Sequence, residues 1–197
     1  MNLKDSQTRI NLMRSFAGES QARNRYTYAA EAAKSQSLHV IEAVFKFTAN
    51  QEKEHGKIFY NYLKEMTGEN ITIDGSYPVD IYDDVLKLLR SAQHNEFEEF
   101  EPVYPDFAAV ANQEGFTNIG AKFNQIAKIE KTHGDRFGMF ADLLEQGKLF
   151  VSDVEEEWMC LNCGYVHKSS EAPKSCPVCS HPQGYFVRLK LAPFTTL

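Results

Sequence analysis

Apolar residues recur at alternating steps of four and three along most of the chain, which is the spacing of one face of an amphipathic helix. The repeat through Ile41, Phe45 and Phe59 is one example. Four helices are predicted in this way, at about residues 5–34, 39–66, 80–112 and 116–146. The short break after the first helix predicts an antiparallel hairpin, and the longer connection at 67–80 predicts a crossover to a second hairpin.

Charged residues stand in the middle of these apolar faces, where large hydrophobic side chains are expected. Glu52 and His55 are three residues apart, so they share the inward face of one helix. Glu130 and His133 repeat this pair on another helix. Buried charges are normally paired or bound to metal, and inward-facing Glu-x-x-His pairs hold iron or manganese in helix bundles. A metal site at the centre of the bundle is therefore predicted.

The other two helices add carboxylates to this site. Glu19 lies on the first helix, and Glu96 and Glu99 lie on the third. Glu19 precedes Glu52 by 33 residues, and Glu96 precedes Glu130 by 34. This spacing indicates an internal repeat, so we expect two metal half-sites related by a pseudo-two-fold axis.

The third predicted helix contains Pro102 and Pro105. Each proline lacks a backbone donor, so we expect a kink just past the two carboxylates, although the helix could instead end there. Asp80 is the predicted N-cap of this helix, with Asp83 and Asp84 favouring its positive end.

Two C-x-x-C pairs near the C-terminus predict a second metal site of a different kind. The four cysteines are Cys160, Cys163, Cys176 and Cys179. Four thiolates on two tight turns form a tetrahedral site that suits zinc or a single iron. Trp158 and Tyr165 beside the first pair resemble the aromatic core beside the iron site of rubredoxins, and this resemblance favours iron over zinc. The preceding segment, 148–157, is predicted to be a linker that ends in an acidic run.

Composition and charge narrow the function further. The chain has 197 residues, 43% of them hydrophobic, and this allows one large domain and a small second one. A net charge of −6 without a basic cluster argues against nucleic acid as a partner. No apolar run has the length of a membrane span or a signal peptide. Because all four cysteines belong to the metal motif, the cytoplasm is the expected compartment.

Together, these motifs resemble the rubrerythrin family, in which a ferritin-like di-iron bundle precedes a rubredoxin-like domain. The resemblance rests on the Glu19–Tyr26 stretch, on the two Glu-x-x-His pairs, and on Glu96-x-x-Glu99 followed by Tyr104-Pro105. Ser180 follows the last cysteine, where free rubredoxins usually have glycine. The implied fold is mainly α, with a bundle at 1–147, a linker at 148–157 and the small domain at 158–197.

The resemblance also implies roles for the site residues. Glu52 and Glu130 would bridge two irons. Glu19 would cap one iron and His133 the other. The first iron would move between Glu99 when oxidised and His55 when reduced, with Glu96 as a further ligand of that same ion. Tyr26 and Tyr104 would hydrogen-bond to ligand carboxylates, although both could equally be ordinary core tyrosines. A third iron would occupy the cysteine site, where recombinant protein could carry zinc instead.

The implied activity is reduction of hydrogen peroxide in an oxygen-sensitive cell. Electrons would come from an external rubredoxin or an NAD(P)H-dependent reductase and pass through the cysteine-bound iron. A head-to-tail homodimer would let each small domain serve the di-iron site of its partner. One alternative is a ferroxidase, which would not need the appended electron carrier. The other is a zinc-ribbon adaptor protein, which the inward-facing metal-ligand residues argue against.

Overall fold

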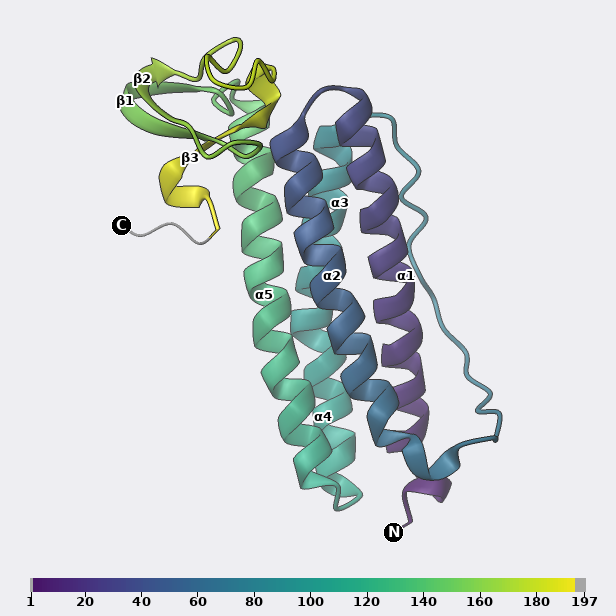
Figure 1. Ribbon diagram of the computed structural model, residues 1–197. Helices are drawn as coiled ribbons and strands as arrows, with labels where there is room; N and C mark the ends of the chain where they lie inside the picture. The colour runs from purple at the N-terminus through teal and green to yellow at the C-terminus, as the bar shows by residue number, and fades with distance from the viewer. Residues whose placement is uncertain (1, 194–197) are drawn as a thin grey trace.

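The computed structural model describes residues 2–193 and consists of a helical bundle with a small β-domain at one end (Figure 1). The helices are α1 (Gln7–Ser35), α2 (His39–Tyr62), α3 (Val85–Glu98), α4 (Tyr104–Gln113) and α5 (Thr117–Glu145). The strands are β1 (Val151–Cys160), β2 (Val166–Glu171) and β3 (Phe186–Arg188). The predicted mainly α fold, a four-helix bundle followed by a four-cysteine domain, is confirmed.

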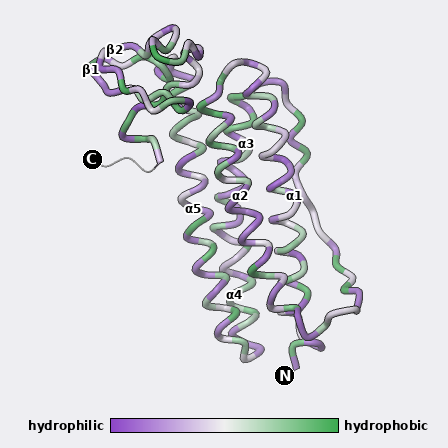
Figure 2. Tube along the Cα trace, in the orientation of Figure 1, coloured by the Kyte–Doolittle hydropathy of each residue, from purple (hydrophilic) through white to green (hydrophobic). Residues whose placement is uncertain are grey.

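The bundle is made of two hairpins. Helices α1 and α2 pack along each other, and α5 packs along both α3 and α4. The turn between α1 and α2 is short because Ser37 adopts a left-handed conformation, with φ of 60°. Along each bundle helix, hydrophilic and hydrophobic residues alternate (Figure 2), as an amphipathic helix requires. Within the described residues, none of the helices has both the length and the hydropathy to cross a membrane.

The predicted third helix is kinked rather than ended at its prolines. A π-helical segment, Glu99–Val103, joins α3 to α4 and contains Pro102 after a cis peptide bond. Glu101 leaves the helical conformation, with φ of −157° and ψ of 114°. The chain then continues as α4, so one bent element supplies the third side of the bundle (Figure 1).

The crossover between the hairpins runs as an extended segment along α1 (Figure 1). The prediction that Asp80 caps the next helix is wrong. Asp84 is the N-cap of α3, because its side chain accepts a hydrogen bond from the amide of Leu86 at 2.8 Å. Asp80 instead accepts hydrogen bonds from Arg25 at 2.7 Å and from Asn95 at 2.9 Å, which tie the crossover to α1 and α3.

The small domain contains a three-stranded antiparallel sheet in the order β2-β1-β3. Strand β1 begins at Val151, so most of the predicted linker is part of the sheet. Trp158 and Phe186 are fully buried in the core of this domain. Residues 194–197, which were assigned to the same domain, lie outside the described residues.

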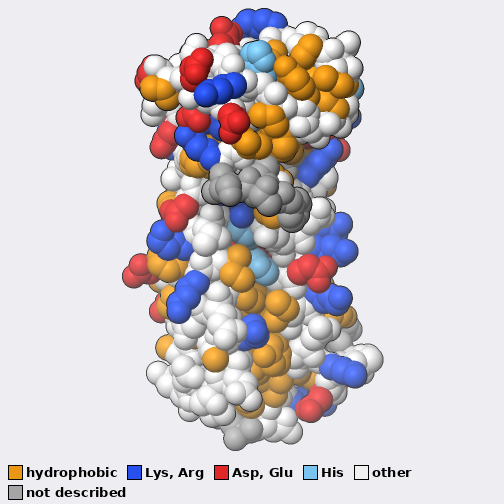
Figure 3. Space-filling view, turned by 60° about the vertical axis from the view of Figure 1, so that its left-hand side comes forward, with side chains coloured by type: hydrophobic (Ala, Val, Ile, Leu, Met, Phe, Trp, Pro, Cys, Tyr) orange, Lys and Arg blue, Asp and Glu red, His pale blue; other side chains and the backbone are white. Residues whose placement is uncertain are grey.

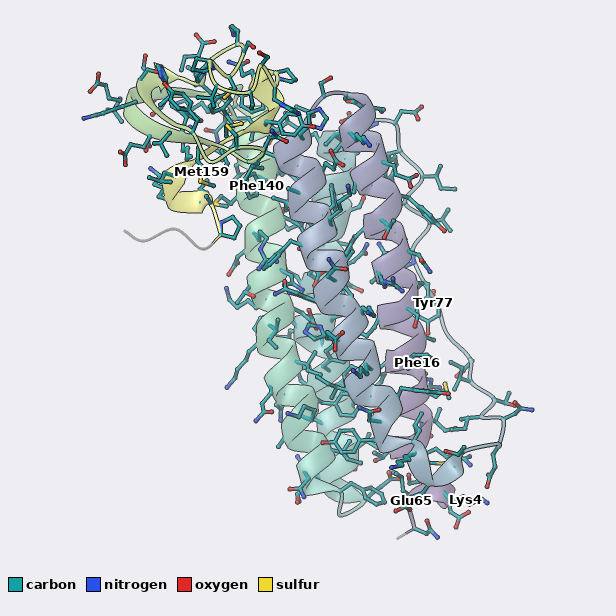
Figure 4. All side chains as sticks on the ribbon, viewed as in Figure 1. Lys4, Phe16, Glu65, Tyr77, Phe140 and Met159 are labelled. Atoms are coloured by element: carbon teal, nitrogen blue, oxygen red, sulfur yellow. The ribbon has the colours of Figure 1, made fainter. Side chains whose placement is uncertain are left out.

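The small domain packs against the end of its own bundle, next to the turn between α1 and α2 (Figure 1). The ring of Tyr185 stacks on His39 with centroids 4.1 Å apart. Gly184 lies so close to the turn that a Cβ there would be 1.8 Å from the carbonyl oxygen of Ser37. Met159 of β1 belongs to the same apolar cluster as Phe140 of α5 (Figure 4). The cysteine site therefore lies near the first turn of α2.

Candidate metal centres

The predicted ligands of the bundle converge midway along the helices, between two apolar clusters. One cluster contains Phe45 and Phe137, and the other contains Phe59 and Phe123. Two groups of potential ligand atoms lie between these clusters, and within each group all the atoms lie within 4.8 Å of one another. The first group comes from Glu19, Glu52, His55 and Glu130, and the second comes from Glu52, Glu96, Glu130 and His133. All of these side chains are buried. Helices α1, α2, α3 and α5 all contribute, as the four apolar repeats predict.

The two groups have the symmetry that the internal repeat predicts. Each contains three glutamates and one histidine, and Glu52 and Glu130 belong to both. Exchanging one hairpin for the other converts the first group into the second. Glu52 and Glu130 therefore stand where two metal ions would share ligands, and the bridging role that the family resemblance implies for them stays a prediction.

The placement of Glu96 differs from the expectation. Its carboxylate groups with His133 on the second half-site, and not with His55 on the first. Glu96 Oε2 lies 3.3 Å from His133 Nδ1. The pseudo-two-fold axis explains this result, because it makes Glu96 the counterpart of Glu19, which groups with His55.

The short distances within the two groups are explained better by metal ligation than by hydrogen bonds between the side chains. His133 Nδ1 is 2.9 Å from both Glu52 Oε1 and Glu130 Oε2, without hydrogen-bond geometry to either. Buried atoms that lack a hydrogen-bond partner include one oxygen each of Glu19, Glu52 and Glu96, both of Glu130 and both nitrogens of His133. Metal–ligand distances of about 2.1 Å place neighbouring ligand atoms roughly 3 Å apart. The residues present therefore fit a pair of metal ions.

Two of the grouped carboxyl groups, Glu96 and Glu19, have raised pKa values. Burial raises the pKa of Glu96 to about 8, and the charge on Glu52 adds to the effect. Burial also raises the pKa of Glu19 well above its usual value. For His133, burial alone would lower the pKa, but the carboxylates of Glu130 and Glu52 outweigh it and raise the pKa to about 12. A metal ion that binds here must displace the protons of these groups.

Glu99 lies beside the two groups rather than in them. It begins the π-helical segment, and its Oε1 would be 3.9 Å from a Cβ at Gly18 on α1. The carboxylate lines a cavity of about 600 Å³ between α1, the bent third element and the crossover. Burial, followed by the charges on Glu96 and Glu130, raises its pKa well above the usual value. Its predicted role as an alternative ligand to His55 stays a prediction.

Two tyrosines hydrogen-bond to ligand carboxylates in a crossed arrangement. Tyr26 of α1 donates to Glu96 of α3, whereas Tyr104 of α4 donates to Glu19 of α1, the latter at 2.5 Å. Both phenols are buried, and burial raises their pKa values well above the usual range. The two tyrosines therefore hold the ligand carboxylates in orientation, in addition to filling the core.

The four cysteine sulfur atoms form a compact group, all within 4.8 Å of one another. Cys160 Sγ lies 3.7 Å from Cys179 Sγ, and Cys163 Sγ lies 3.6 Å from Cys176 Sγ. At metal–sulfur distances of about 2.3 Å, a tetrahedral site has sulfur separations of roughly 3.8 Å. All four thiols are free, so the spacing fits a metal and not disulfides.

The two cysteine turns are built alike. The amide of Gly164 donates to the carbonyl of Cys160 at 2.8 Å, and that of Ser180 donates to Cys176 at 2.9 Å. Gly164 has φ of 77° and Ser180 has φ of 59°. Ser180 therefore occupies the position where the turn favours glycine, in agreement with its place in the sequence motif. A hydrogen bond from the backbone of His181 lowers the pKa of the Cys179 thiol to about 6.

Sequence reasoning missed two residues that border the site. Gly18 and Tyr77 line the cavity beside Glu99, and a Cβ at Gly18 would be 3.8 Å from the Tyr77 ring. The only signal for Gly18 is its place directly before Glu19 inside a helix, where glycine is unfavourable. Nothing in the sequence indicates that the crossover brings Tyr77 to the same point.

A helical bundle with a carboxylate- and histidine-lined site for two metals, followed by a four-cysteine domain, defines a two-centre metalloprotein of the ferritin-like and rubredoxin-like kind. A family model described as rubrerythrin matches residues 11–141, and one described as rubrerythrin, rubredoxin-like domain, matches residues 158–187. The chain belongs to the rubrerythrin family.

Known relatives match the chain over nearly its whole length. It is 45% identical to the rubrerythrin of Clostridium perfringens, covering 94% of this chain and 95% of that protein. It is 44% identical to the rubrerythrin of Porphyromonas gingivalis, covering 96% and 93%. A structure of mixed-valence nigerythrin aligns with a TM-score of 0.61 at 28% identity, covering 93% of this chain and 90% of that one. A bacterioferritin of Desulfovibrio desulfuricans shares the bundle fold, with a TM-score of 0.65 at 21% identity and coverage of 75% and 86%.

Proposed function

We propose that the chain is a peroxidase that reduces hydrogen peroxide to water, with two irons in the bundle and one at the four cysteines. The observation that carries the proposal is the combination of a dimetal site and a tetrahedral thiolate site in one chain. Membership of the rubrerythrin family supports it. Iron is supported by the relatives, since one solved structure is described as fully reduced, all-ferrous nigerythrin.

The reaction consumes two electrons and two protons and converts one peroxide molecule into two water molecules. Two bound ferrous ions would supply those two electrons as a pair, which allows O–O bond cleavage without release of a radical. Glu52 and Glu130 would be shared by the two ions, with Glu19 and His55 on one side and Glu96 and His133 on the other. Glu99, between the ligands and the cavity, would replace His55 as a ligand on oxidation.

The cysteine site would pass electrons singly from an external rubredoxin or an NAD(P)H-dependent reductase. The di-iron site of the same chain would be a poor electron acceptor for this cysteine site. The small domain docks at His39, and the di-iron ligands begin thirteen residues further along α2. At 1.5 Å per residue this separation is about 20 Å. A head-to-tail homodimer would place the cysteine site of one chain beside the di-iron site of its partner.

The surface beside the ligands suits such a second copy. A groove of about 620 Å³ lies between α2, α5 and the small domain, and it is lined by apolar residues such as Val44, Met139 and Leu191. Phe47 on its rim is exposed. Hydrophobic side chains gather on the small domain and in a strip that runs down the bundle below it (Figure 3).

Free thiols at metal-binding distance also support a reducing compartment, so we propose that the protein acts in the cytoplasm.

Three measurements test the proposed function. Protein purified without oxygen should contain three irons per chain, and its reduced form should consume hydrogen peroxide faster than oxygen. In the Cys176→Ser variant, the chemically reduced bundle should still consume one equivalent of peroxide, while turnover driven by NAD(P)H and a reductase should be lost. An empty bundle, or turnover by Cys176→Ser at the wild-type rate, would contradict the proposal.

A further inference from the structure

The crossover between the hairpins is fastened to α1 at two points. Arg14 pairs with Asp74, and Arg25 pairs with Asp80 at 2.7 Å. Arg14 and Arg25 are eleven residues apart, which is about three helical turns, so both lie on the same face of α1. The segment 74–80 is thus held along that face, as its course beside α1 shows (Figure 1).

Tyr77 lies midway between these two fastenings, next to α1 (Figure 4). Its hydroxyl donates a hydrogen bond to the carbonyl oxygen of Arg14 at 3.2 Å. Its ring lies against two glycines. A Cβ at Gly75 would be 2.9 Å from the ring, and a Cβ at Gly18 would be 3.8 Å from it. The ring is therefore packed in place, although 41% of the residue is exposed.

Beneath this ring lies the cavity that reaches Glu99 and Tyr104. Gly18 lines this cavity between Tyr77 and Glu99, since a Cβ at Gly18 would be 3.8 Å from the Tyr77 ring and 3.9 Å from Glu99 Oε1. Tyr104 continues inward to Glu19, to which it donates a hydrogen bond of 2.5 Å. The dimetal ligands themselves are at most 6% exposed, so a molecule from solvent needs a passage of this kind.

The charges around the cavity favour a neutral molecule over an anion. The two guanidinium groups at its edge, on Arg14 and Arg25, are already neutralised by Asp74 and Asp80. Glu99, the side chain at its inner end, supplies no positive charge. A site for an anionic ligand would instead present unpaired cations or backbone amides.

We propose that Tyr77 and Gly18 limit the size of the oxidant, so that the site accepts hydrogen peroxide and rejects organic hydroperoxides. The inference rests on the proposed peroxidase function. An organic hydroperoxide would react with the same balance, taking two electrons and two protons and giving an alcohol and water. Its alkyl group, however, would have to fit into the part of the cavity bounded by Tyr77, Gly18 and Glu99. A methyl group added to Gly18 would already contact both the Tyr77 ring and Glu99 there.

The test compares hydrogen peroxide with tert-butyl hydroperoxide in the iron-loaded protein. The Tyr77→Ala variant should raise kcat/KM for the organic substrate, relative to hydrogen peroxide, by about tenfold or more, since a few methyl groups carry that much discrimination. Tyr77→Phe keeps the ring and should keep the wild-type ratio. Tyr82→Ala is the matched control, because Tyr82 is equally exposed on the same connection but does not line the cavity beside Glu99.

Gly18→Ala tests the opposite direction. The added methyl group fits at van der Waals distance from Tyr77 and Glu99, so the helix should fold while the passage narrows. We expect slower reaction with hydrogen peroxide and an unchanged thermal midpoint to within a few degrees.

A second readout does not depend on turnover. Azide and the bulkier acetohydroxamic acid can be bound to the oxidised, iron-loaded protein and followed by absorbance. Tyr77→Ala should accelerate acetohydroxamic acid binding, relative to azide, by about tenfold. If wild-type protein fails to reduce peroxide but this ratio changes, the proposed function fails and the size limit stands. If peroxide is reduced and neither ratio changes in Tyr77→Ala, the size limit is wrong.

Discussion

Tyr26 and Tyr104 show at the level of single residues how the internal repeat is built. Tyr26 follows Glu19 by seven residues, and Tyr104 follows Glu96 by eight. Each tyrosine nevertheless donates to the glutamate of the other hairpin. The extra residue falls at the kink in the segment Glu99–Val103, where Glu101 leaves the helical conformation. The hydrogen bonds obey the symmetry even where the sequence spacing does not.

Glu99 occupies that π-helical segment, and its removal tests its role. The Glu99→Ala variant should bind both irons, because the two groups of ligands that converge in the bundle do not include it. Reaction of the reduced protein with peroxide should slow by at least about tenfold, if Glu99 holds the oxidised state. Stopped-flow absorbance measures the rate. Glu98→Ala is the control, because Glu98 lines the same cavity; unchanged kinetics in Glu99→Ala would reject the ligand role.

Ser180 carries backbone strain that its counterpart Gly164 does not. A side chain in the left-handed region costs about 1 kcal/mol, whereas glycine adopts it freely. Ser180→Gly should therefore leave metal binding unchanged and stabilise the small domain by up to about 1 kcal/mol. Gly164→Ala should destabilise it by a similar amount. Thermal unfolding of the metal-loaded protein measures both, and equal effects of the two substitutions would contradict the explanation.

At the scale of elements, one periodicity predicts both the helices and the buried glutamates and histidines. Residues at steps of four and three face the core, so a charged residue at such a step must be buried. The kink was predictable from Pro102, but the π-helical geometry was not. The position of Asp80 was not predictable either, because its partners Arg25 and Asn95 come from two other elements.

Strand β1 shows why the secondary structure of the predicted linker could not be derived from the sequence. Its middle contains the acidic run Glu155–Glu157, which has low strand propensity and therefore predicts a solvated linker. In the structure, Glu156 pairs with Ser169 and Glu157 with Lys168 of β2, after an irregularity in register. Pairing with a distant segment, and not local preference, makes this segment a strand.

The start of α1 has a cap that only the folded structure reveals. The carboxylate of Glu114, at the end of the second hairpin's bent element, accepts hydrogen bonds from the amides of Gln7 and Thr8, both at 2.8 Å. Burial would raise the pKa of Glu114, but the hydrogen bonds from Thr8 and Gln7 outweigh it and lower the pKa. This anion neutralises the positive end of the helix.

Glu114→Gln should therefore cost about 1 kcal/mol of unfolding free energy at neutral pH. Because the folded-state pKa is lowered, the stabilisation is present above the ordinary pKa of 4.5 and disappears as the pH falls through the folded-state value. The stabilities of wild type and variant should converge in acid. Denaturant titrations between pH 7 and pH 3 measure the difference, and Gln113→Ala serves as a neighbouring control. A difference that persists in acid would exclude the charge as its cause.

At the scale of the whole molecule, the docking of the small domain bears on the proposed transfer of electrons between the two chains of a homodimer. A Cys176→Ser chain mixed with a Glu52→Ala chain should regain activity in the reductase-coupled assay. Half of the randomly mixed dimers are heterodimers, and each has one competent pair of sites, so about a quarter of the wild-type activity is expected. Mass spectrometry confirms that heterodimers form. Their inactivity would show that electrons stay within one chain.

The shared carboxylates also have a mechanical consequence. Each group of ligands takes three residues from one hairpin and one from the other, Glu130 for the first group and Glu52 for the second. Packing is extensive within each hairpin and sparse between α2 and α5. Bound metals would thus crosslink the two hairpins across the sparsely packed interface between α2 and α5. Removing the metals should loosen this interface while each hairpin stays folded. Amide hydrogen exchange should then rise first along the facing sides of α2 and α5.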